Sequence, residues 1–420
     1  MSHIQTICVV GLGYVGLPLA VALSKHFEVT GYDTSHKRIE DLHQNYDFTG
    51  EVSPDELVDS PLELSTGPLV GADIYIITVP TPVDDMNAPD LTPLANACKA
   101  VGSVMKEGSI VVFESTVYPG VTEDFCEPLL RQYSDHIAFH VAYSPERVNP
   151  GDREHKLSCV TKIVAASEPA IARQLAGVYG HISGEIHIAP SIRVAEAAKV
   201  IENAQRDINI AFINEITMIF SKMDINTFDV LDAARTKWNF LDFRPGLVGG
   251  HCIGVDPFYL AQASMRAGHV PEIILAGRRT NDGMSKWFAN EICKRLQPDK
   301  KRVLVLGATF KENVPDMRNS KALDLIDSLI SRGCTVDVYD PVADYNQLRG
   351  MLDNRHIRLL SELPAGAHPH YHAVVEAVAH TAFQNTVYPG TLLYTNGLFA
   401  DLKGTYRGGK VCQHYRYWCP

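Results

Sequence analysis

The stretch Ile7-Cys-Val-Val-Gly-Leu-Gly-Tyr-Val-Gly16 decides the fold of this 420-residue chain. An apolar run ends in three glycines with the spacing G-x-G-x-x-G, and a helical pattern follows them. In a strand–turn–helix unit, Gly11 permits the tight turn, Gly13 lets a pyrophosphate approach the backbone, and Gly16 allows the helix to pack closely on the strand. The free N–H groups of a helix N-terminus favour such an anion. The stretch therefore predicts a Rossmann-like unit.

A second apolar run, Val29–Tyr32, is followed directly by Asp33. An acidic residue at this point binds the 2′-hydroxyl of a cofactor ribose and repels a 2′-phosphate. Glycine turns also arise for packing reasons alone, but here the strand, turn, helix and second strand all fall in register. We therefore predict NAD rather than NADP as the cofactor, and we assign Tyr14, Val15 and Arg38 to the same site.

The pattern around this stretch extends through both ends of the chain. Further apolar runs at Asp73–Val79 and Ser109–Phe113 alternate with segments of helix length, which is typical of a parallel sheet with crossover helices. After Lys300 the same alternation returns. Its expected elements are the strand Val303–Gly307, the helix Ser320–Ser331 and the strand Thr335–Asp340. We predict an α/β fold with two Rossmann-like domains. The stretch after Gly408 is aromatic and irregular, and we assign no element to it.

The segment between the two domains has a different character. Ser191–Met223 runs without Pro or Gly, and its apolar residues recur at helical spacing. At 1.5 Å per residue such a helix would be about 50 Å long, more than a small domain needs. We expect it to link the two domains through a helical middle domain, with boundaries near 190 and 298, and to form a subunit interface.

The overall charge and the cysteines bound the function. With 38 basic and 49 acidic residues the net charge is −11, so bulk charge should not hold nucleic acid or anionic lipid. The nine cysteines are scattered without a C-x-x-C pair, which argues against a disulfide framework or structural zinc and favours reduced thiols. We find no signal-peptide pattern and no apolar run of about 18 residues. We expect a soluble cytoplasmic protein with no bound metal.

Two segments of the middle region carry candidate chemistry. Lys199 and Asn203 are four residues apart, so they share one helix face among apolar neighbours. A lysine is unexpected there unless it has a partner or a task, although its head could also reach solvent. In the glycine-rich loop at 243–258, Cys252 is preceded by His251 and followed by Asp256. A polar, glycine-rich setting makes thiolate chemistry plausible for Cys252, whereas the other cysteines are expected to be inert.

Two threonine–proline clusters follow strands of the first domain. Thr81 and Thr116 lie just beyond the runs at Asp73–Val79 and Ser109–Phe113. In open α/β sheets, ligands bind at the carboxyl ends of the strands. Threonine and proline are also common in loops without any function, and this explains the two clusters equally well.

Six motifs together give the chain a recognisable pattern. They are G-L-G-Y-V-G-L-P, E-S-T-V-Y-P-G, Y-S-P-E-R-V-N-P-G-D, A-E-A-A-K-V-I-E-N, G-G-H-C-I-G-V-D-P and F-K-E-N-V-P-D-M-R-N-S. In this order they resemble the UDP-glucose/GDP-mannose dehydrogenase family over nearly the full length. The resemblance implies oxidation of a nucleotide sugar at its 6-hydroxyl to a carboxylate, with two NAD+ and an essential cysteine. It also implies an NAD-binding domain at 1–190, a central dimerisation and catalytic domain at 191–297, a C-terminal UDP-sugar-binding domain at 298–420 and a homodimer.

The resemblance also implies roles for individual residues. Cys252 matches the nucleophile that traps the aldehyde and forms a thioester. Lys199 and Asn203 match the groups that stabilise the oxyanion. The remaining catalytic positions are those that activate or order water: Asp256, Glu146 and Thr116. Further implied contacts to NAD come from Thr81 and Arg318, and those to the nucleotide sugar from Arg147, residues 241–245, Gly249 and Lys311, with Arg244 facing a phosphate or uronate.

Two departures from the family and one feature of the second domain refine this picture. Val255 precedes Asp256 where the UDP-glucose branch has a lysine, so the chain resembles the branch that acts on UDP-N-acetylhexosamines. Enzymes of that branch supply acidic amino sugars for bacterial capsule and O-antigen. Glu376 places a charge inside a strand pattern that is apolar in the family. The glycine signature is lost after Gly307, which suits a different phosphate ligand. The roles of His251 and of His155 stay open.

The leading hypothesis is a UDP-N-acetylglucosamine 6-dehydrogenase. UDP-N-acetylgalactosamine is the close second because the two sugars differ at one hydroxyl, and UDP-glucose is a further alternative. A single-step NAD-dependent dehydrogenase of the hydroxyacid type would not need Cys252. A nucleotide-binding regulator without catalysis is disfavoured by the intact set of Lys199, Asn203, Cys252 and Asp256.

Overall fold

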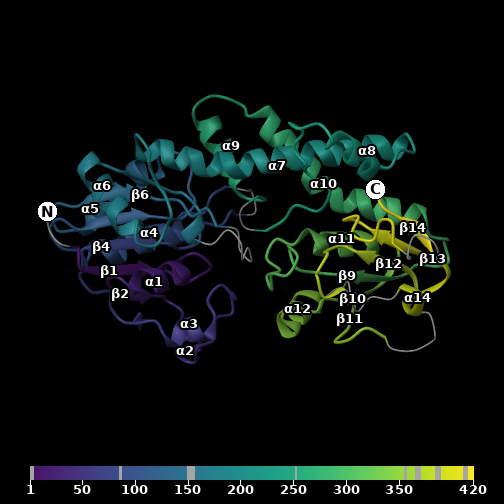
Figure 1. Cartoon of the computed structure of the whole chain (residues 1–420), viewed down its shortest axis with the longest axis horizontal. Coiled ribbons are helices and arrows are strands. Elements are labelled where there is room, and N and C mark those ends of the chain that lie inside the picture. Colours follow the sequence, from purple (N-terminus) through teal and green to yellow (C-terminus); the bar gives the residue numbers. More distant parts are fainter. Residues whose placement is uncertain are drawn as a thin grey trace. The chain divides into compact units, whose positions relative to one another are not determined.

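The computed structural model describes two compact units, each built on its own sheet of mainly parallel strands (Figure 1). The described residues are 4–84, 88–148, 157–250, 253–353, 357–364, 370–383, 389–409 and 415–420. The first unit comprises Met1–Asn203 and Phe258–Val270, and the second comprises Ala204–Pro257 and Pro271–Pro420. In the part of the chain that the structure describes, no helix is both long and apolar enough to cross a bilayer.

The first unit contains an eight-stranded sheet in the order β3-β2-β1-β4-β5-β6-β7-β8. Its strands are β1 (Thr6–Val10), β2 (Glu28–Tyr32), β3 (Glu63–Ser65), β4 (Ile74–Ile77), β5 (Ile110–Phe113), β6 (His140–Tyr143), β7 (Lys162–Ala166) and β8 (Ile186–Ile188). All neighbours pair in parallel except β6 and β7, which are antiparallel. The four strands expected from the sequence are confirmed. The central strands β4 and β5 are buried along their full length, as expected for a sheet covered on both faces.

Helices cover both faces of this sheet. One face packs against α1 (Gly16–Ser24), α2 (His36–His43) and α6 (Pro169–Tyr179). The other packs against α4 (Thr92–Gly102), α5 (Glu127–Tyr133) and the start of α7 (Ile192–Lys222). A short helix, α3 (Pro54–Val58), precedes β3. The predicted long helix at 191–223 is thus confirmed as the single helix α7, whose residues belong partly to each unit.

The second unit contains a six-stranded parallel sheet in the order β11-β10-β9-β12-β13-β14. Its strands are β9 (Arg302–Leu306), β10 (Thr335–Tyr339), β11 (Arg358–Leu359), β12 (Tyr371–Glu376), β13 (Leu393–Asp401) and β14 (Arg416–Trp418). Its helices are α8 (Thr227–Ala234), α10 (Glu272–Lys294), α11 (Lys321–Ile330), α12 (Tyr345–Leu352) and α14 (Pro389–Leu392), while α9 (Asp256–Arg266) belongs partly to each unit. We predicted no element for the residues after Gly408, but they include the edge strand β14.

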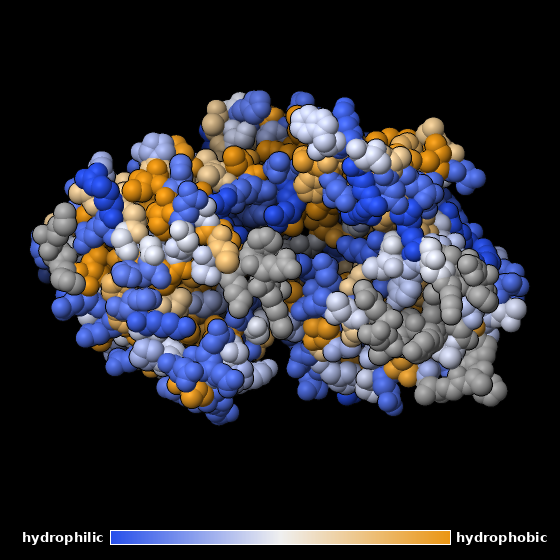
Figure 2. Space-filling view, in the orientation of Figure 1, coloured by the Kyte–Doolittle hydropathy of each residue, from blue (hydrophilic) through white to orange (hydrophobic). Residues whose placement is uncertain are grey.

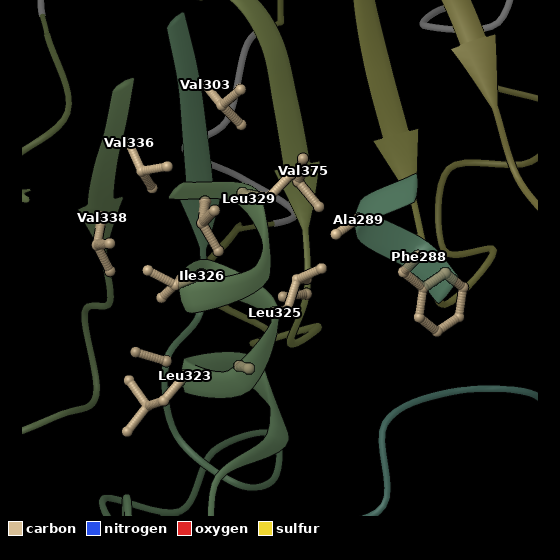
Figure 3. Close-up of a cluster of buried hydrophobic side chains, with 14 of the residues drawn as sticks. Phe288, Ala289, Val303, Leu323, Leu325, Ile326, Leu329, Val336, Val338 and Val375 are labelled. Atoms are coloured by element: carbon tan, nitrogen blue, oxygen red, sulfur yellow. The ribbon is translucent and has the colours of Figure 1, made fainter. Parts of the chain in front are cut away.

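The core of the second unit lies between α10, α11 and the sheet. Leu325, Ile326 and Leu329 of α11 are fully buried and point toward the valines of β9, β10 and β12 (Figure 3). Phe288 and Ala289 of α10 complete the same cluster. Burial of each large side chain contributes about 1.5–3 kcal/mol, so this cluster fixes α10 and α11 on the sheet.

The two units repeat the same turn after their first strand. The N–H of Gly11 donates to Tyr32 O at 2.7 Å, and the N–H of Gly307 donates to Tyr339 O at 2.9 Å. Both glycines have positive φ, +99° and +90°. In the second unit, however, a Cβ on Gly307 would lie 2.5 Å from the Val378 side chain. The chain itself therefore fills the space beside the second turn, which agrees with the loss of the glycine signature there.

Candidate active site

The turn between β1 and α1 has the shape of a phosphate cradle. A Cβ on Gly16 would lie 1.8 Å from Gly11 O, so only glycine permits this approach of helix and strand. A Cβ on Gly13 would meet open space, and Gly13, Tyr14 and Val15 are all partly exposed. The N-terminus of α1 is thus accessible to a ligand. These residues fit the pyrophosphate of a dinucleotide cofactor.

Asp33 and Arg38 hold this turn from the second strand. The two carboxylate oxygens of Asp33 accept the N–H groups of Leu12 and Ser35, each at 2.9 Å. Arg38 is buried, donates from Nε to Leu12 O at 2.8 Å, and forms an ion pair with Asp47 at 2.8 Å. Both residues assigned to the cofactor site therefore lie at the glycine turn, bonded to the backbone of Leu12.

The ends of β4 and β5 come together beside this turn. Thr81 Oγ1 donates to Thr116 O at 2.7 Å, so the two threonine clusters lie side by side rather than in separate loops. Thr78 Oγ1 donates to Gly11 O at 2.7 Å and links the end of β4 to the glycine turn. The buried Tyr259 hydroxyl donates to Thr81 O. The sequence patterns did not indicate Thr78 or Tyr259.

A buried ionic network lies at the carboxyl ends of β5 and β6. Lys162 Nζ contacts Glu114 Oε2 at 2.6 Å and Glu146 Oε2 at 3.8 Å. The Tyr179 hydroxyl donates to Glu114 Oε1 at 2.5 Å. Burial raises the pKa of Glu114, while the charge of Lys162 opposes this rise. Lys162 is only 2 % exposed. Its positive charge therefore compensates the negative charges of Glu114 and Glu146 in a low-dielectric interior.

Glu146 connects this network to the middle region of the sequence. Its Oε1 accepts the N–H groups of Arg147 and Val148, each at 2.6 Å, which fixes the carboxylate against its own loop. Its backbone oxygen accepts a hydrogen bond from Lys199 Nζ at 2.7 Å. The Arg147 guanidinium pairs with Glu202 at 2.8 Å. Three residues that the sequence assigned to catalysis or substrate, Glu146, Arg147 and Lys199, are therefore brought together.

Lys199 and Asn203 are both buried on α7, 8 % and 7 % exposed. The alternative in which the Lys199 ammonium reaches bulk solvent is thus wrong, because its Nζ donates to Glu146 O instead. Asp256 is also buried and is the first residue of α9. Cys252, His251 and His155 lie outside the described residues, so the proposed nucleophile and both histidines stay predictions.

The glycines around Cys252 approach another segment of the second unit. A Cβ on Gly249 would lie 2.2 Å from Asn319 O, and one on Gly250 would lie 2.6 Å from the Phe310 ring. Asn319 Nδ2 also donates to Gly250 O at 3.0 Å. The family resemblance assigned Gly249 to the nucleotide sugar. The structure gives Gly249 and Gly250 a further task, since they let the loop at 309–319 pack against the loop that carries Cys252.

Cationic side chains in the second unit gather near this loop. A small pocket is lined by Lys311 and Lys403 together with Thr309 and Leu247. Arg244 lies with its guanidinium carbon 5.8 Å from the centre of the Phe228 ring and pairs with Asp242. The acidic Glu312 also lines this pocket, so the two lysines do not face it alone. The role assigned to Lys311 at the nucleotide sugar stays a prediction. Lys403 was not found from the sequence.

Arg318, assigned to the cofactor, is held by its own loop. Its guanidinium pairs with Asp316 at 2.7 Å, and its backbone N–H donates to the same carboxylate at 2.9 Å. The Arg318 side chain is 52 % exposed, so it can still reach a ligand. The buried Asp316 thus orients this arginine.

Glu376, the charge that departs from the family pattern, ends β12 beside another acid. In the sheet register it pairs with Asp401 at the end of β13, and it accepts a hydrogen bond from the Thr405 hydroxyl. Asp401 accepts the N–H groups of Lys403, Gly404 and Tyr406. Burial and the charge of Asp401 raise the pKa of Glu376 from 4.5 to about 8. Glu376 is therefore protonated at neutral pH and can donate to Asp401.

Replacing Glu376 with Gln should make the second unit less sensitive to alkaline pH. The folded chain holds a proton that the unfolded chain releases near pH 4.5, so stability is full below that pH and is lost as the pH rises toward about 8. Gln keeps a hydrogen-bond donor and cannot ionise. Thermal unfolding at about pH 5 and about pH 8 should show a smaller loss for E376Q than for the wild type. The exposed Glu362→Gln is the control, and parallel losses in E376Q and wild type would contradict the assignment.

Sequence profiles of the UDP-glucose/GDP-mannose dehydrogenase family match three successive parts of the chain. Residues 5–183 match its NAD binding domain, residues 193–283 its central domain and residues 304–407 its UDP binding domain. The first match contains the glycine turn, and the last contains Lys311 and Lys403.

Individual relatives are similar over nearly the whole chain. The UDP-N-acetyl-D-glucosamine 6-dehydrogenase of Pseudomonas aeruginosa is 47% identical over 392 residues, which cover 90% of this chain and 91% of the relative. Protein CapL of Staphylococcus aureus is 44% identical over 431 residues and covers 99% of both chains. Among solved structures, the UDP-D-ManNAc dehydrogenase of Pyrococcus horikoshii superposes with a TM-score of 0.83 at 26% identity, covering 98% of this chain and 99% of that one.

Proposed function

Because the chain belongs to the UDP-glucose/GDP-mannose dehydrogenase family, we propose that it oxidises UDP-N-acetylglucosamine at its 6-hydroxyl to the uronic acid. It is an NAD-dependent nucleotide-sugar dehydrogenase, and its similarity to the Pseudomonas aeruginosa enzyme of that name, 47% identical over 90% of this chain, carries the choice of sugar. Val255 in place of the lysine of the UDP-glucose branch supports the same choice.

The proposed reaction needs two hydride transfers from one carbon. NAD+ supplies the hydride acceptor in each of them. Between the two steps the Cys252 thiolate adds to the aldehyde, which prevents its escape and gives a thiohemiacetal. Loss of the second hydride leaves a thioester on Cys252, and attack by water releases the acid. Asp256, Glu146 and Thr116 are assigned to activating and ordering that water.

Lys199 and Asn203 are the proposed stabilisers of the oxyanion. Two features of the structure support this role: both side chains are buried on α7, and Lys199 Nζ is held at 2.7 Å by the backbone oxygen of Glu146. A fixed ammonium in a buried site stabilises a developing negative charge more strongly than a mobile one in water. Lys199 bonds to the backbone oxygen of Glu146 and not to its carboxylate. We therefore propose that the positive charge of Lys199 acts on the substrate.

The proposed binding residues divide between the units. For NAD we assign the first-unit residues Gly11, Gly13, Tyr14, Val15, Gly16, Asp33, Arg38, Thr81 and Thr116, together with Arg318 of the second unit. For the UDP-sugar we assign Glu146, Arg147, Lys199, Asn203, Arg244, Gly249 and Lys311. We place the reaction in the cytoplasm, the compartment that cysteines scattered without a C-x-x-C pair predict, and its product in the synthesis of capsule or O-antigen. We divide the chain into domains at 1–190, 191–297 and 298–420.

The exposed face of α7 supports a homodimer. Val194, Ile201, Phe212 and Ile219 are 46%, 52%, 56% and 45% exposed. Their separations of 7, 11 and 7 residues are close to whole numbers of helical turns, so the four side chains form one stripe. Figure 2 shows apolar residues among hydrophilic ones over α7 and α8. A long apolar stripe on a helix indicates a protein interface, and we propose that a second copy of the chain covers it.

Replacing Phe212 with Glu should break this dimer. The change puts a charge at the middle of the stripe, where a partner would have to bury it without a counter-ion. Light scattering should give twice the chain mass for the wild type and the single chain mass for F212E. Val58→Glu, at a 65 % exposed position on α3, is the matched control and should leave the mass unchanged. A dimer that persists in F212E and in I201E would place the interface elsewhere.

A comparison of substrates tests the sugar. NADH formation should be measured with UDP-N-acetylglucosamine, UDP-N-acetylgalactosamine, UDP-glucose and GDP-mannose. The proposal expects the highest kcat/KM with UDP-N-acetylglucosamine. A higher value with UDP-N-acetylgalactosamine or UDP-glucose would reassign the sugar within the same chemistry, and turnover of none of the four would overturn the proposed function.

A further inference from the structure

We propose that Cys293 and Cys334 form a peroxide-reactive dithiol site in the second unit, apart from the proposed nucleophile Cys252. The two sulfur atoms lie 3.7 Å apart. Cys293 is near the end of α10, and Cys334 lies in the turn between α11 and β10. They are 41 residues apart in sequence, so the fold rather than the local chain brings them together.

The two thiols differ in access and in charge. Cys293 is half-buried, whereas Cys334 is only 6 % exposed and belongs to the core around α10 and α11. Donation from the Cys334 thiol, together with the positive charges of Lys301 and Arg332, lowers the pKa of Cys293 from 9.0 to about 7. The same bond and burial raise the pKa of Cys334. At neutral pH about half of the accessible Cys293 is therefore thiolate, while the buried Cys334 stays a thiol.

The two cations are held in place by hydrogen bonds to a backbone oxygen and to a side-chain amide. Lys301 Nζ donates to Arg332 O at 2.9 Å, and Arg332 Nε donates to Asn290 Oδ1 of α10 at 2.6 Å. Neither of these two contacts involves a carboxylate, so neither neutralises the positive charge beside Cys293. A thiolate stabilised by fixed cations is the form that attacks an oxidant.

Hydrogen peroxide or an organic hydroperoxide is the oxidant this arrangement suits. The Cys293 thiolate attacks one peroxide oxygen, the O–O bond breaks, and the leaving oxygen takes a proton to become water or an alcohol. Cys293 is then a sulfenic acid. The Cys334 sulfur attacks the Cys293 sulfur, the S–O bond breaks, and the leaving hydroxide takes the Cys334 proton to become water. Two thiols lose two electrons in total, and one peroxide is reduced.

Other described cysteines lack one part of this arrangement. Cys98 and Cys126 also interact with each other, but both are fully buried and burial raises the pKa of Cys126. Cys8 is likewise buried, which raises its pKa to about 12. Cys159 is exposed, and its sulfur contacts the Ser158 hydroxyl at 3.8 Å. Cys159 is therefore the appropriate comparison for simple exposure.

Peptide mapping of the peroxide-treated full-length protein tests the proposal. Trypsin releases Cys293 in Trp287–Lys294 and Cys334 in Gly333–Arg349, each the single cysteine of its peptide. One equivalent of hydrogen peroxide should link these two peptides with the loss of two hydrogen atoms, and dithiothreitol should separate them. Because the Cys334 thiol and the two cations stabilise its thiolate, Cys293 should react about tenfold faster than the exposed Cys159.

Two variants identify the order of the steps. Cys334→Ser keeps a hydrogen-bond donor beside Cys293 but removes the second sulfur, so Cys293 should accumulate as a sulfenic acid that dimedone traps. Cys159→Ser should leave the linked peptides unchanged. The proposal is overturned if Cys159 is oxidised while Cys293 stays unmodified, or if Cys293 is linked to another cysteine. The readout is a peptide mass, so the result is independent of the substrate that the enzyme accepts.

Discussion

Replacing Cys252 with Ala should lower NADH formation from UDP-N-acetylglucosamine by on the order of 10³-fold or more. Without the thiolate the aldehyde is not held on the enzyme, and the second oxidation has no thiohemiacetal from which to start. The wild type and the variant should be compared by NADH absorbance at saturating substrate and NAD+. The variant should still bind NAD, because the glycine turn and Asp33 belong to the first unit and Cys252 does not.

Cys159→Ala is the matched control for this prediction. Cys159 is exposed and lies in the first unit, so its loss should leave turnover unchanged. Undiminished turnover in C252A would contradict the covalent mechanism. That result would instead favour the single-step dehydrogenase that the sequence left as an alternative.

Replacing Lys162 with Met should destabilise the first unit by about 3–5 kcal/mol, because it removes the cation from a buried pair and leaves the carboxylate of Glu114 unpaired. Burial already raises the pKa of Glu114, and the loss of Lys162 raises it further. A group of this kind contributes stability at low pH that is lost as the pH rises. The loss of thermal stability in K162M should therefore be larger at about pH 8 than at about pH 5.

The double variant K162M/E114Q separates the buried charge from the shape of the site. A neutral Gln can still accept the Tyr179 hydroxyl, so the double variant should recover part of the stability and lose the added pH dependence. K162M should also lower kcat, since Glu146 loses the ammonium 3.8 Å from its carboxylate. If K162M were as stable as the wild type at both pH values, the account of this network would be wrong.

The sequence predicted the fold well where a pattern has a single physical cause. The glycine turn, the four strands around it and the long helix α7 follow from apolar periodicity and from Gly11 and Gly16, and the structure has them. The strands near the C-terminus were harder to predict from apolar periodicity. β12 ends in Glu376, and β13 ends in Asp401, so acids interrupt the apolar pattern that marks a strand. The protonation of Glu376 depends on its burial, and apolar periodicity does not predict the burial of an acidic residue.

For the candidate site, the sequence indicated single residues better than their contacts. Lys199 stood out as a cation among apolar neighbours, and the structure supplies its partner, the backbone oxygen of Glu146. Lys162, the first residue of the otherwise apolar strand β7, carries the same signal, since a lysine is rarely buried without a partner. Our sequence prediction did not include it. Glu114 is the partner, 48 residues away, and only the fold shows the pairing.

The number of NADH molecules formed for each UDP-N-acetylglucosamine consumed tests the central claim most directly. A limiting, weighed amount of the nucleotide sugar should be converted to completion with excess NAD+, and NADH should be read by its absorbance. Four-electron oxidation predicts two NADH per sugar and a uronic acid as the sole sugar product. One NADH per sugar, with an aldehyde as product, would contradict the account.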